Sequence, residues 1–174
     1  MKLAFNIVIF FCAAMLSNCN SRHNRPSSPA SSSQEAMIDA NRGFVSAENE
    51  RIDSYVARRG WKMTKTGTGL RYEIYTRVDT SSPKPIDDDV VFITYSISLL
   101  DGTLCYEQLQ TPESFRVARD NVESGLHEGI RYMRAGEQAR LILPPHLAHG
   151  LVGDRDKIPM NASIVYDLKL HRIL

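Results

Sequence analysis

The amino-acid sequence predicts an α+β fold, in which several strands accompany one short helix after an N-terminal leader and a helical extension. Three observations lead to this prediction. Residues 91–99 alternate strictly along a strand, residues 126–133 carry an apolar stripe at helical spacing, and residues 164–170 alternate again. A length of 174 residues suits one domain with appendages. The net charge of +1, without a strongly basic block, gives no indication of a nucleic-acid partner.

The N-terminus has the composition of a targeting segment. Residues 3–16 form an apolar run that is too short and too early for a membrane span but is typical of a secretory signal. The run ends in Leu-Ser-Asn-Cys, which resembles a bacterial lipobox. We therefore expect residues 1–18 to be a lipoprotein signal peptide, cleaved before Cys19, and Cys19 to be lipidated. Asn18 stands where a small residue is usual, so an ordinary signal peptide with an unrelated cysteine is the alternative.

Two segments follow the leader. Residues 19–34 are rich in Ser, Pro, Asn and Arg and predict a flexible tether. Residues 35–63 are predicted to be helical, with Ile52, Tyr55 and neighbouring Val56 on one face and Ser46 as N-cap. That helix packs either on its own domain or against a second copy in a dimer. Trp61 and Met63 are expected to attach it to the sheet.

The middle of the chain reads as strands. Residues 70–78 predict a strand, and residues 91–99 are the clearest half-buried strand of the sequence. The Asp-Gly pair at 101–102 then predicts a hairpin. Residues 107–113 are interpreted as a polar excursion before a short strand at 115–117. The three aspartates at 87–89 lack the ligand spacing of a calcium loop, so we interpret them as charges that protect a strand from edge association.

The C-terminal part predicts a helix, a strand, an exposed loop and a strand. Leu126, Ile130 and Met133 share a helix face, and Gly136 is placed as the glycine that ends such a helix. Apolar positions 139, 141 and 143 then alternate along a strand, which two prolines terminate. A loop with Gly150, Gly153 and Pro159 leads to the last strand.

These C-terminal residues resemble the FKBP-type peptidyl-prolyl isomerases. The matching positions are Gly125-Leu126, Gly129-Ile130, Met133, Gly136-Glu137, residues 144–150, Ile158-Pro159 and residues 161–170. The resemblance implies a twisted antiparallel sheet wrapped around one short helix, over residues 64–174. It also implies isomerisation of X-Pro bonds without a cofactor or a metal. The lipobox, the tether and the helix together resemble the lipoprotein FKBPs of the Bacteroidetes, some of which are associated with gliding motility.

The resemblance also implies the site. The expected pocket residues are Tyr95, Tyr106, Val122, Leu126, His149, Ile158 and Tyr166, and the expected rim residues are Cys105, Glu113 and Glu123. Several of these depart from the family pattern, because Cys105, Glu113 and Glu123 replace apolar or aromatic walls. Smaller and charged walls wet a pocket and weaken its hold on a prolyl ring. Weak isomerase activity and a binding or chaperone module without catalysis are therefore both open.

The expected partners are proline-containing, unfolded or partner proteins of the cell envelope. The expected location is a bacterial membrane, facing the periplasm, with the outer membrane favoured. Other chemistry has little support in the sequence. His146, His149 and Cys105 lack tight ligand spacing for a metal, and no serine or cysteine elbow accompanies His149. Once Cys12 has left with the signal and Cys19 is modified, Cys105 has no disulfide partner.

Overall fold

The structure is a computed structural model that describes residues 29–174, with side chains described from residue 33 onward. The predicted signal peptide, Cys19 and the first part of the predicted tether lie outside the described residues. The helix α2 (Pro29–Arg59) begins within the range assigned to the tether, so residues 29–34 are helical and not an extended linker. Residues 41–174 form one compact unit, which holds all the strands.

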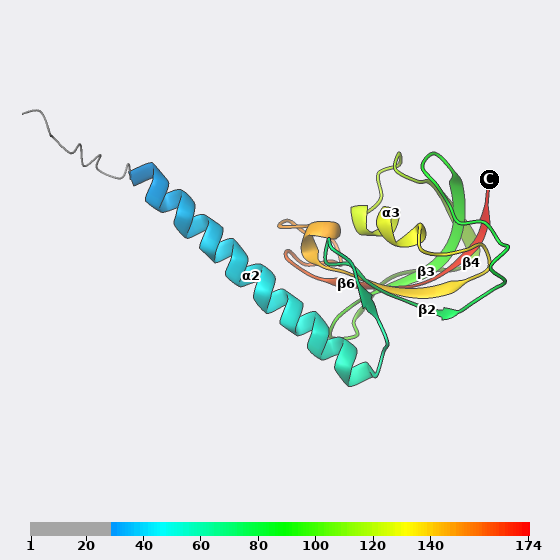
Figure 1. Ribbon diagram of the computed structural model, residues 1–174, viewed down its shortest axis with the longest axis horizontal. Coiled ribbons are helices and arrows are strands. Elements are labelled where there is room, and N and C mark those ends of the chain that lie inside the picture. The colour runs from blue at the N-terminus through cyan, green and yellow to red at the C-terminus, as the bar shows by residue number, and fades with distance from the viewer. Residues whose placement is uncertain (1–28) are drawn as a thin grey trace, which may run out of the picture. The chain divides into compact units, whose positions relative to one another are not determined.

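Six strands form one antiparallel sheet in the order β1-β2-β5-β6-β3-β4. Their bounds are β1 (Thr64–Lys65), β2 (Arg71–Thr76), β3 (Val90–Leu99), β4 (Leu104–Arg116), β5 (Gln138–Leu143) and β6 (Ile164–Ile173). The sheet curves around the short helix α3 (Ser124–Ile130), as Figure 1 shows. The prediction of a twisted antiparallel sheet wrapped around one helix, with an N-terminal helical extension, is confirmed.

The main core lies between α3 and the concave face of the sheet. Leu126 and Ile130 of α3 are buried, as is Met133 just beyond the helix, and they belong to one cluster with Leu141 and Leu143 of β5. Full burial of such a side chain stabilises the fold by roughly 1.5–3 kcal/mol. The apolar stripe predicted for this helix is therefore confirmed. The helix itself ends at Ile130, before the predicted Gly136, which instead adopts a positive φ of 94° in the turn before β5.

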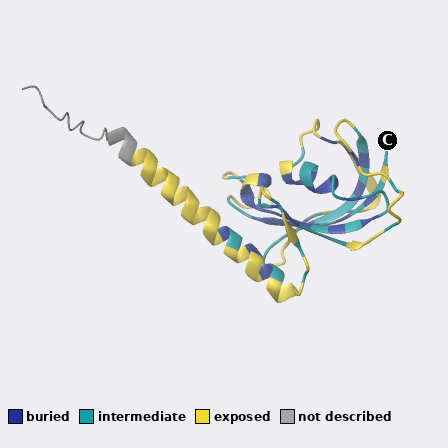
Figure 2. Ribbon diagram, in the orientation of Figure 1, coloured by how far each residue is buried: buried dark blue, intermediate teal, exposed yellow. Residues whose placement is uncertain are grey.

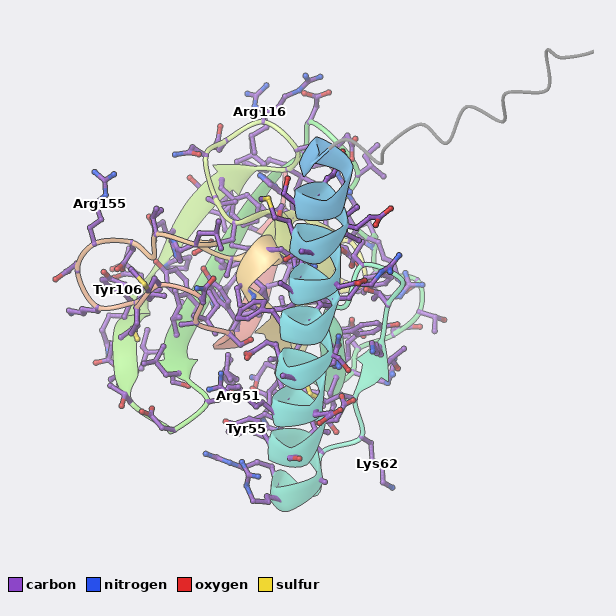
Figure 3. All side chains as sticks on the ribbon, turned by 90° about the vertical axis from the view of Figure 1, so that its left-hand side faces the viewer. Arg51, Tyr55, Lys62, Tyr106, Arg116 and Arg155 are labelled. Atoms are coloured by element: carbon purple, nitrogen blue, oxygen red, sulfur yellow. The ribbon has the colours of Figure 1, made fainter. Side chains whose placement is uncertain are left out.

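The last turns of α2 cover part of the opposite face of the sheet. Ile52 and Tyr55 are buried against Ile142 of β5 and Val165 of β6, while most of the preceding helix is exposed (Figure 2). Trp61 packs edge-on against Tyr55, with ring centroids 5.5 Å apart. Figure 3 shows Tyr55 and Arg51 on the same side of α2, one turn apart. The predicted packing of this helix face on its own domain is thus observed.

Buried polar contacts fix α2 in place on the sheet. Arg71 of β2 is 2% exposed and donates hydrogen bonds to Asp53 at 2.7 Å and Asn49 at 2.8 Å. Ser163 donates to the buried carboxylate of Glu48 at 2.5 Å. Because buried polar groups are costly without partners, these bonds specify where the helix lies along the sheet.

Two local predictions need correction. Ser46 does not cap a helix, since α2 runs continuously through it. Residues 107–113 belong to strand β4 and are not an excursion outside the sheet. The register nevertheless slips there: Tyr95 pairs with Gln108 while Ile93 pairs with Glu113, so residues 109–112 have no counterpart on β3. Such a bulge lets polar residues occupy a strand without a regular ladder.

Candidate functional site

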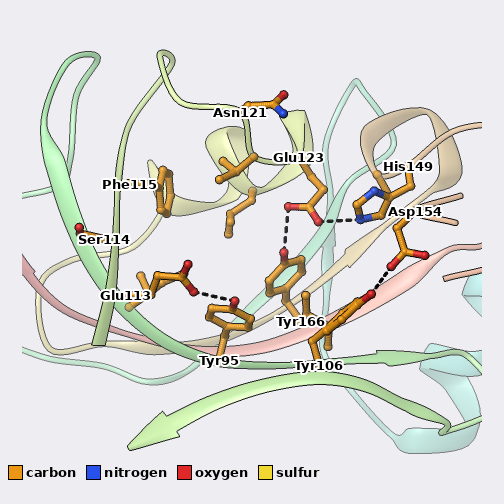
Figure 4. A pocket seen from close by; sticks show the side chains of 15 residues that line it. Tyr95, Tyr106, Glu113, Ser114, Phe115, Asn121, Glu123, His149, Asp154 and Tyr166 are labelled. Carbon is orange, nitrogen blue, oxygen red and sulfur yellow. Dashed lines mark hydrogen bonds and ion pairs between the residues drawn. The ribbon is translucent and has the colours of Figure 1, made fainter. Parts of the chain in front are cut away.

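A pocket of about 490 Å³ opens between the concave face of the sheet and the N-terminal end of α3. Figure 4 shows its side chains, which come from β3, β4, β6, residues 121–126 and residues 148–154. The apolar part of the lining consists of Ile93, Ile97, Phe115, Val122, Leu126 and Ala148. The polar part includes three tyrosines, three carboxylates and one histidine.

Two of the tyrosines extend from neighbouring strands at the centre of the sheet. Tyr95 of β3 and Tyr166 of β6 have ring centroids 5.7 Å apart at an angle of 52°. Tyr166 is 3% exposed and Tyr95 is half-buried, so the Tyr166 ring lies deeper in the pocket than the Tyr95 ring. Alternation along each strand places both rings on the concave face, where a flat apolar ligand can pack against them.

Each tyrosine donates its hydroxyl to a carboxylate. The distances are 2.8 Å from Tyr95 to Glu113, 2.9 Å from Tyr166 to Glu123 and 2.5 Å from Tyr106 to Asp154. Burial and the neighbouring Glu113 raise the pKa of Tyr95 to about 12. Burial and Glu123 likewise raise the pKa of Tyr166, while the bond to Asp154, followed by burial, raises that of Tyr106. All three phenols therefore stay protonated at neutral pH.

Glu123 connects two side chains of the pocket. It occupies the N-cap position of α3 but makes no side-chain capping bond. One carboxylate oxygen instead accepts the Tyr166 hydroxyl, and the other lies 2.9 Å from Nε2 of His149. The side chain of Glu123 is 12% exposed, so this pair sits within the wall and not on the open surface.

Asp154 is held by the loop that precedes β6. Its Oδ1 accepts the backbone N–H groups of Asp156 at 2.9 Å and Ile158 at 2.8 Å. Burial opposes its charge, but the bonds from Tyr106 and from these two N–H groups outweigh burial and lower the pKa of Asp154 to about 2. Gly153 has a φ of 65°, and a Cβ there would lie 2.2 Å from the carbonyl oxygen of Ile158. Only glycine lets the loop close this tightly.

The described residues contain no group of three or more His, Cys, Asp or Glu side chains that could hold a metal ion. His146 bonds through Nε2 to the carbonyl oxygen of Thr68 at 2.8 Å, and Cys105 is a buried free thiol. None of the described helices has the length and apolar character needed to cross a bilayer.

Comparison with known proteins agrees with this geometry. Residues 81–171 match the family described as FKBP-type peptidyl-prolyl cis-trans isomerase. The chain belongs to the FKBP family.

Individual FKBP relatives cover different shares of the chain. The chain is 27% identical over 142 residues to a probable FKBP-type isomerase, FkpA, of Neisseria meningitidis, covering 80% of this chain and 52% of that protein. It is 32% identical over 108 residues to FK506-binding protein 2 of Dictyostelium discoideum, covering 61% and 78% respectively. A crystal structure of a peptidyl-prolyl isomerase from Pseudomonas syringae superposes with a TM-score of 0.64 at 26% identity, over 76% of this chain and 94% of that one. The chain spans about half the length of the FkpA proteins it matches.

Most residues expected at an FKBP site do line the pocket. The eight that do are Tyr95, Tyr106, Glu113, Val122, Glu123, Leu126, His149 and Tyr166. Cys105 is not a rim residue: it is 3% exposed, and its Sγ lies 3.6 Å from the carbonyl oxygen of Lys157. The register between β3 and β4 shifts here, so Cys105 has no counterpart on β3, and its side chain is buried in the main core. Ile158 is buried beneath the loop and contributes a backbone N–H to Asp154, but its side chain does not line the pocket.

The sequence reasoning did not identify Asp154 as a site residue. Its loop was recognised from Gly150, Gly153 and Pro159, but a single acidic residue in a loop has no periodicity that indicates its direction. The available signal was Tyr106, which stands where the family has aspartate, since its hydroxyl adds a donor to the site and Asp154 accepts it. Phe115 was placed on a strand, yet its position in the pocket was not anticipated.

Proposed function

We propose that this protein catalyses cis/trans isomerisation of X-Pro bonds by taking the prolyl ring into the pocket. The observation that carries the proposal is a concave site of about 490 Å³ in a member of the FKBP family, with Tyr95, Tyr166 and Leu126 among its walls. Its size and partly apolar lining suit a single prolyl ring with its flanking peptide groups.

The reaction requires little of the protein besides a pocket that fits the twisted amide and excludes water from it. Amide resonance creates a barrier of about 18–20 kcal/mol between the two isomers, which themselves differ by only about 0.5–1 kcal/mol. Binding that favours the twisted amide over either planar form lowers that barrier, and every 1.36 kcal/mol of preference is about tenfold in rate. Val122, Leu126 and the tyrosine rings would exclude water from the twisted bond. The protonated tyrosines could donate only by giving up their carboxylate partners.

A second candidate is a module that binds proline-containing segments without accelerating exchange. The observation that favours it is the polar wall, in which Glu113, Glu123, His149 and Asp154 line the same cavity as the apolar residues. Charged walls retain water, and a wet pocket stabilises the resonance of the planar amide more than a dry one does. The same cleft serves both functions, so catalysis must be measured directly.

The test is an exchange-NMR isomerase assay on the full-length chain with a series of X-Pro peptides. We expect faster exchange in the presence of the protein, and Tyr95→Ala should remove most of the increase. The matched control is Tyr75→Ala, which removes another tyrosine of the sheet that bonds to a carboxylate, Asp167 at 2.5 Å, outside the pocket. Peptide binding with no gain in exchange rate would instead establish the binding module.

We further propose that the protein is an envelope lipoprotein of the Bacteroidetes type, anchored through Cys19 and facing the periplasm, with the outer membrane favoured. The lipobox-like sequence before Cys19 and the similarity to FkpA support this proposal. Its clients would then be proline-containing envelope proteins. Metabolic labelling with a fatty acid tests the anchor: the wild-type chain should incorporate label and Cys19→Ala should not. Equal labelling of both would refute it.

A further inference from the structure

The pocket holds negative charge that no arginine or lysine of its own wall neutralises. Its lining contains Glu113, Glu123 and Asp154, and among the described residues that line it none is Lys or Arg. Three carboxylates and no fixed cation give a formal charge of −3 when His149 is neutral and −2 when it is protonated. A pocket for a neutral prolyl ring does not need this charge.

The pocket carboxylates have mostly neutral partners, as several carboxylates elsewhere in the described chain also do. Six other carboxylates of the described chain form ion pairs with arginine, among them Asp53 with Arg71 and Asp88 with Arg119. In the pocket, by contrast, the partners are tyrosine hydroxyls and backbone N–H groups, which are neutral. Of these partners, only His149 can become a cation, and its Nε2 lies 2.9 Å from Glu123. Neutral donors orient a carboxylate without cancelling its field.

The carboxylates are also spread along the pocket. In Figure 4, Glu113 and Asp154 lie at opposite ends of the row formed by Tyr95, Tyr166 and Tyr106, with Glu123 above its middle. Glu113 comes from the bulged part of β4 and is exposed, so it can reach a ligand that extends beyond the ring. At the other end, the Lys157 ammonium lies 4.8 Å from the centroid of the Tyr106 ring, so a cation of the protein itself already lies beside the phenol that bonds to Asp154. The Glu113 end is therefore the better place for a cation of the ligand.

We propose that the pocket prefers polypeptide segments in which a lysine or arginine adjoins the proline. The prolyl ring lies against the apolar wall, and the cationic side chain of the neighbouring residue extends along the tyrosine row toward Glu113. An acidic neighbour is repelled by the same groups. This inference rests on the proposed function for the place of the prolyl ring, and it adds the class of substrate.

The test compares three peptides that differ only in the residue before proline, Lys, Ala or Glu, and a second set that varies the residue after it. Exchange rates with and without the full-length chain are measured at low and high salt, together with chemical-shift titrations for binding. We expect Lys to exceed Glu by about tenfold in at least one set at low salt, as electrostatic complementarity favours the matching partner. The ratio should shrink markedly in 0.5 M salt, because the Debye length falls from about 10 Å at 0.1 M to about 3 Å at 1 M.

Glu113→Gln keeps an acceptor for the Tyr95 hydroxyl while removing one charge, and should reduce the ratio of Lys to Glu peptides. Glu107→Gln is the matched control, since Glu107 is an exposed glutamate of the same strand that does not line the pocket. For Glu107→Gln, the ratio of the rate with Lys peptides to the rate with Glu peptides should equal that of the wild type.

The outcomes separate the two proposals. Catalysis that is the same for Lys, Ala and Glu peptides overturns the charge preference while isomerase activity stands. Binding that favours Lys without any acceleration supports the charge preference and refutes catalysis. No binding of any peptide overturns both. A preference for Lys that is insensitive to salt in the wild-type chain contradicts the electrostatic origin even if Glu113→Gln does not fold.

Discussion

Gly125 lies where α3 approaches β5 so closely that a single methyl group does not fit. A Cβ at this position would lie 2.5 Å from Cγ of Leu143 and 3.0 Å from the carbonyl oxygen of Leu147. In an open helix, Gly→Ala stabilises by up to about 1 kcal/mol. Here the added methyl forces a packed helix away from the sheet, which costs about 1–3 kcal/mol. The backbone oxygen cannot be relieved by rotating a side chain, so we expect Gly125→Ala to lower the free energy of unfolding by about 1–2 kcal/mol.

Urea denaturation followed by circular dichroism measures this change. For a chain of this size the expected loss corresponds to a decrease of about 2–8 °C in melting temperature. The matched control is Gly43→Ala in α2, where an added Cβ meets no atom within 4 Å and no loss of stability is expected. If Gly125→Ala were as stable as the wild type or more so, the close approach of α3 to β5 would be refuted. Because Glu123 and Leu126 flank the position, the isomerase assay should also register a shift of the helix.

Three further predictions follow from the polar contacts. Arg71→Met leaves Asn49 and Asp53 without their buried partner and should destabilise the fold by about 2–3 kcal/mol in urea denaturation, with no loss if the contact is unimportant. In the folded protein the pKa of Asp154 lies below its ordinary value of 3.8, so its charge stabilises the fold above that pH, and this contribution is lost as the pH falls from about 4 to about 2. When the free energy of unfolding is plotted against pH, the curves of the wild type and Asp154→Asn should therefore converge across that window. Parallel curves would contradict this contribution of Asp154. Tyr166→Phe removes the donor to one oxygen of the Glu123 carboxylate, whose other oxygen keeps His149, and should cost about 1 kcal/mol of stability. An unchanged midpoint would show that the bond contributes nothing.

Periodic segments of the fold could be predicted from the sequence because their side chains repeat on one face. The alternation of residues 91–99 and the stripe of Leu126, Ile130 and Met133 correspond to a strand and to a helix with its following turn. The N-terminal part of α2 gave no such signal. The described side chains from residue 33 to Ala47 are exposed, so no apolar face marks where the helix begins, and a serine such as Ser46 in the middle of the helix resembles a cap.

The sequence could predict which strands and loops carry the site, but not which of their side chains contact one another. The resemblance to FKBP isomerases implies Tyr95 and Tyr166 as pocket residues, alternation puts each on the apolar face of its strand, and both line the pocket. The contact between Tyr106 and Asp154 joins residues 48 positions apart, and nothing local in either segment indicates it. Cys105 is the extra residue of a register shift between β3 and β4, which no pattern in the sequence indicates, and it is buried in the core while Tyr106 lines the pocket.

The position of β6 has a consequence for how the chain is made. This last strand lies between β5 and β3, and no other pairing connects the β1-β2-β5 part of the sheet with the β3-β4 hairpin. A growing chain therefore carries two separate strand groups, each with a bare edge that can pair with other chains, until residues 164–173 have been added. Because Tyr166 belongs to β6, the pairing of β6 with β5 and β3 both completes the sheet and brings Tyr166 into the pocket wall. A chain truncated before Ile164 should accumulate as aggregate and lack the part of the pocket wall that Tyr166 forms.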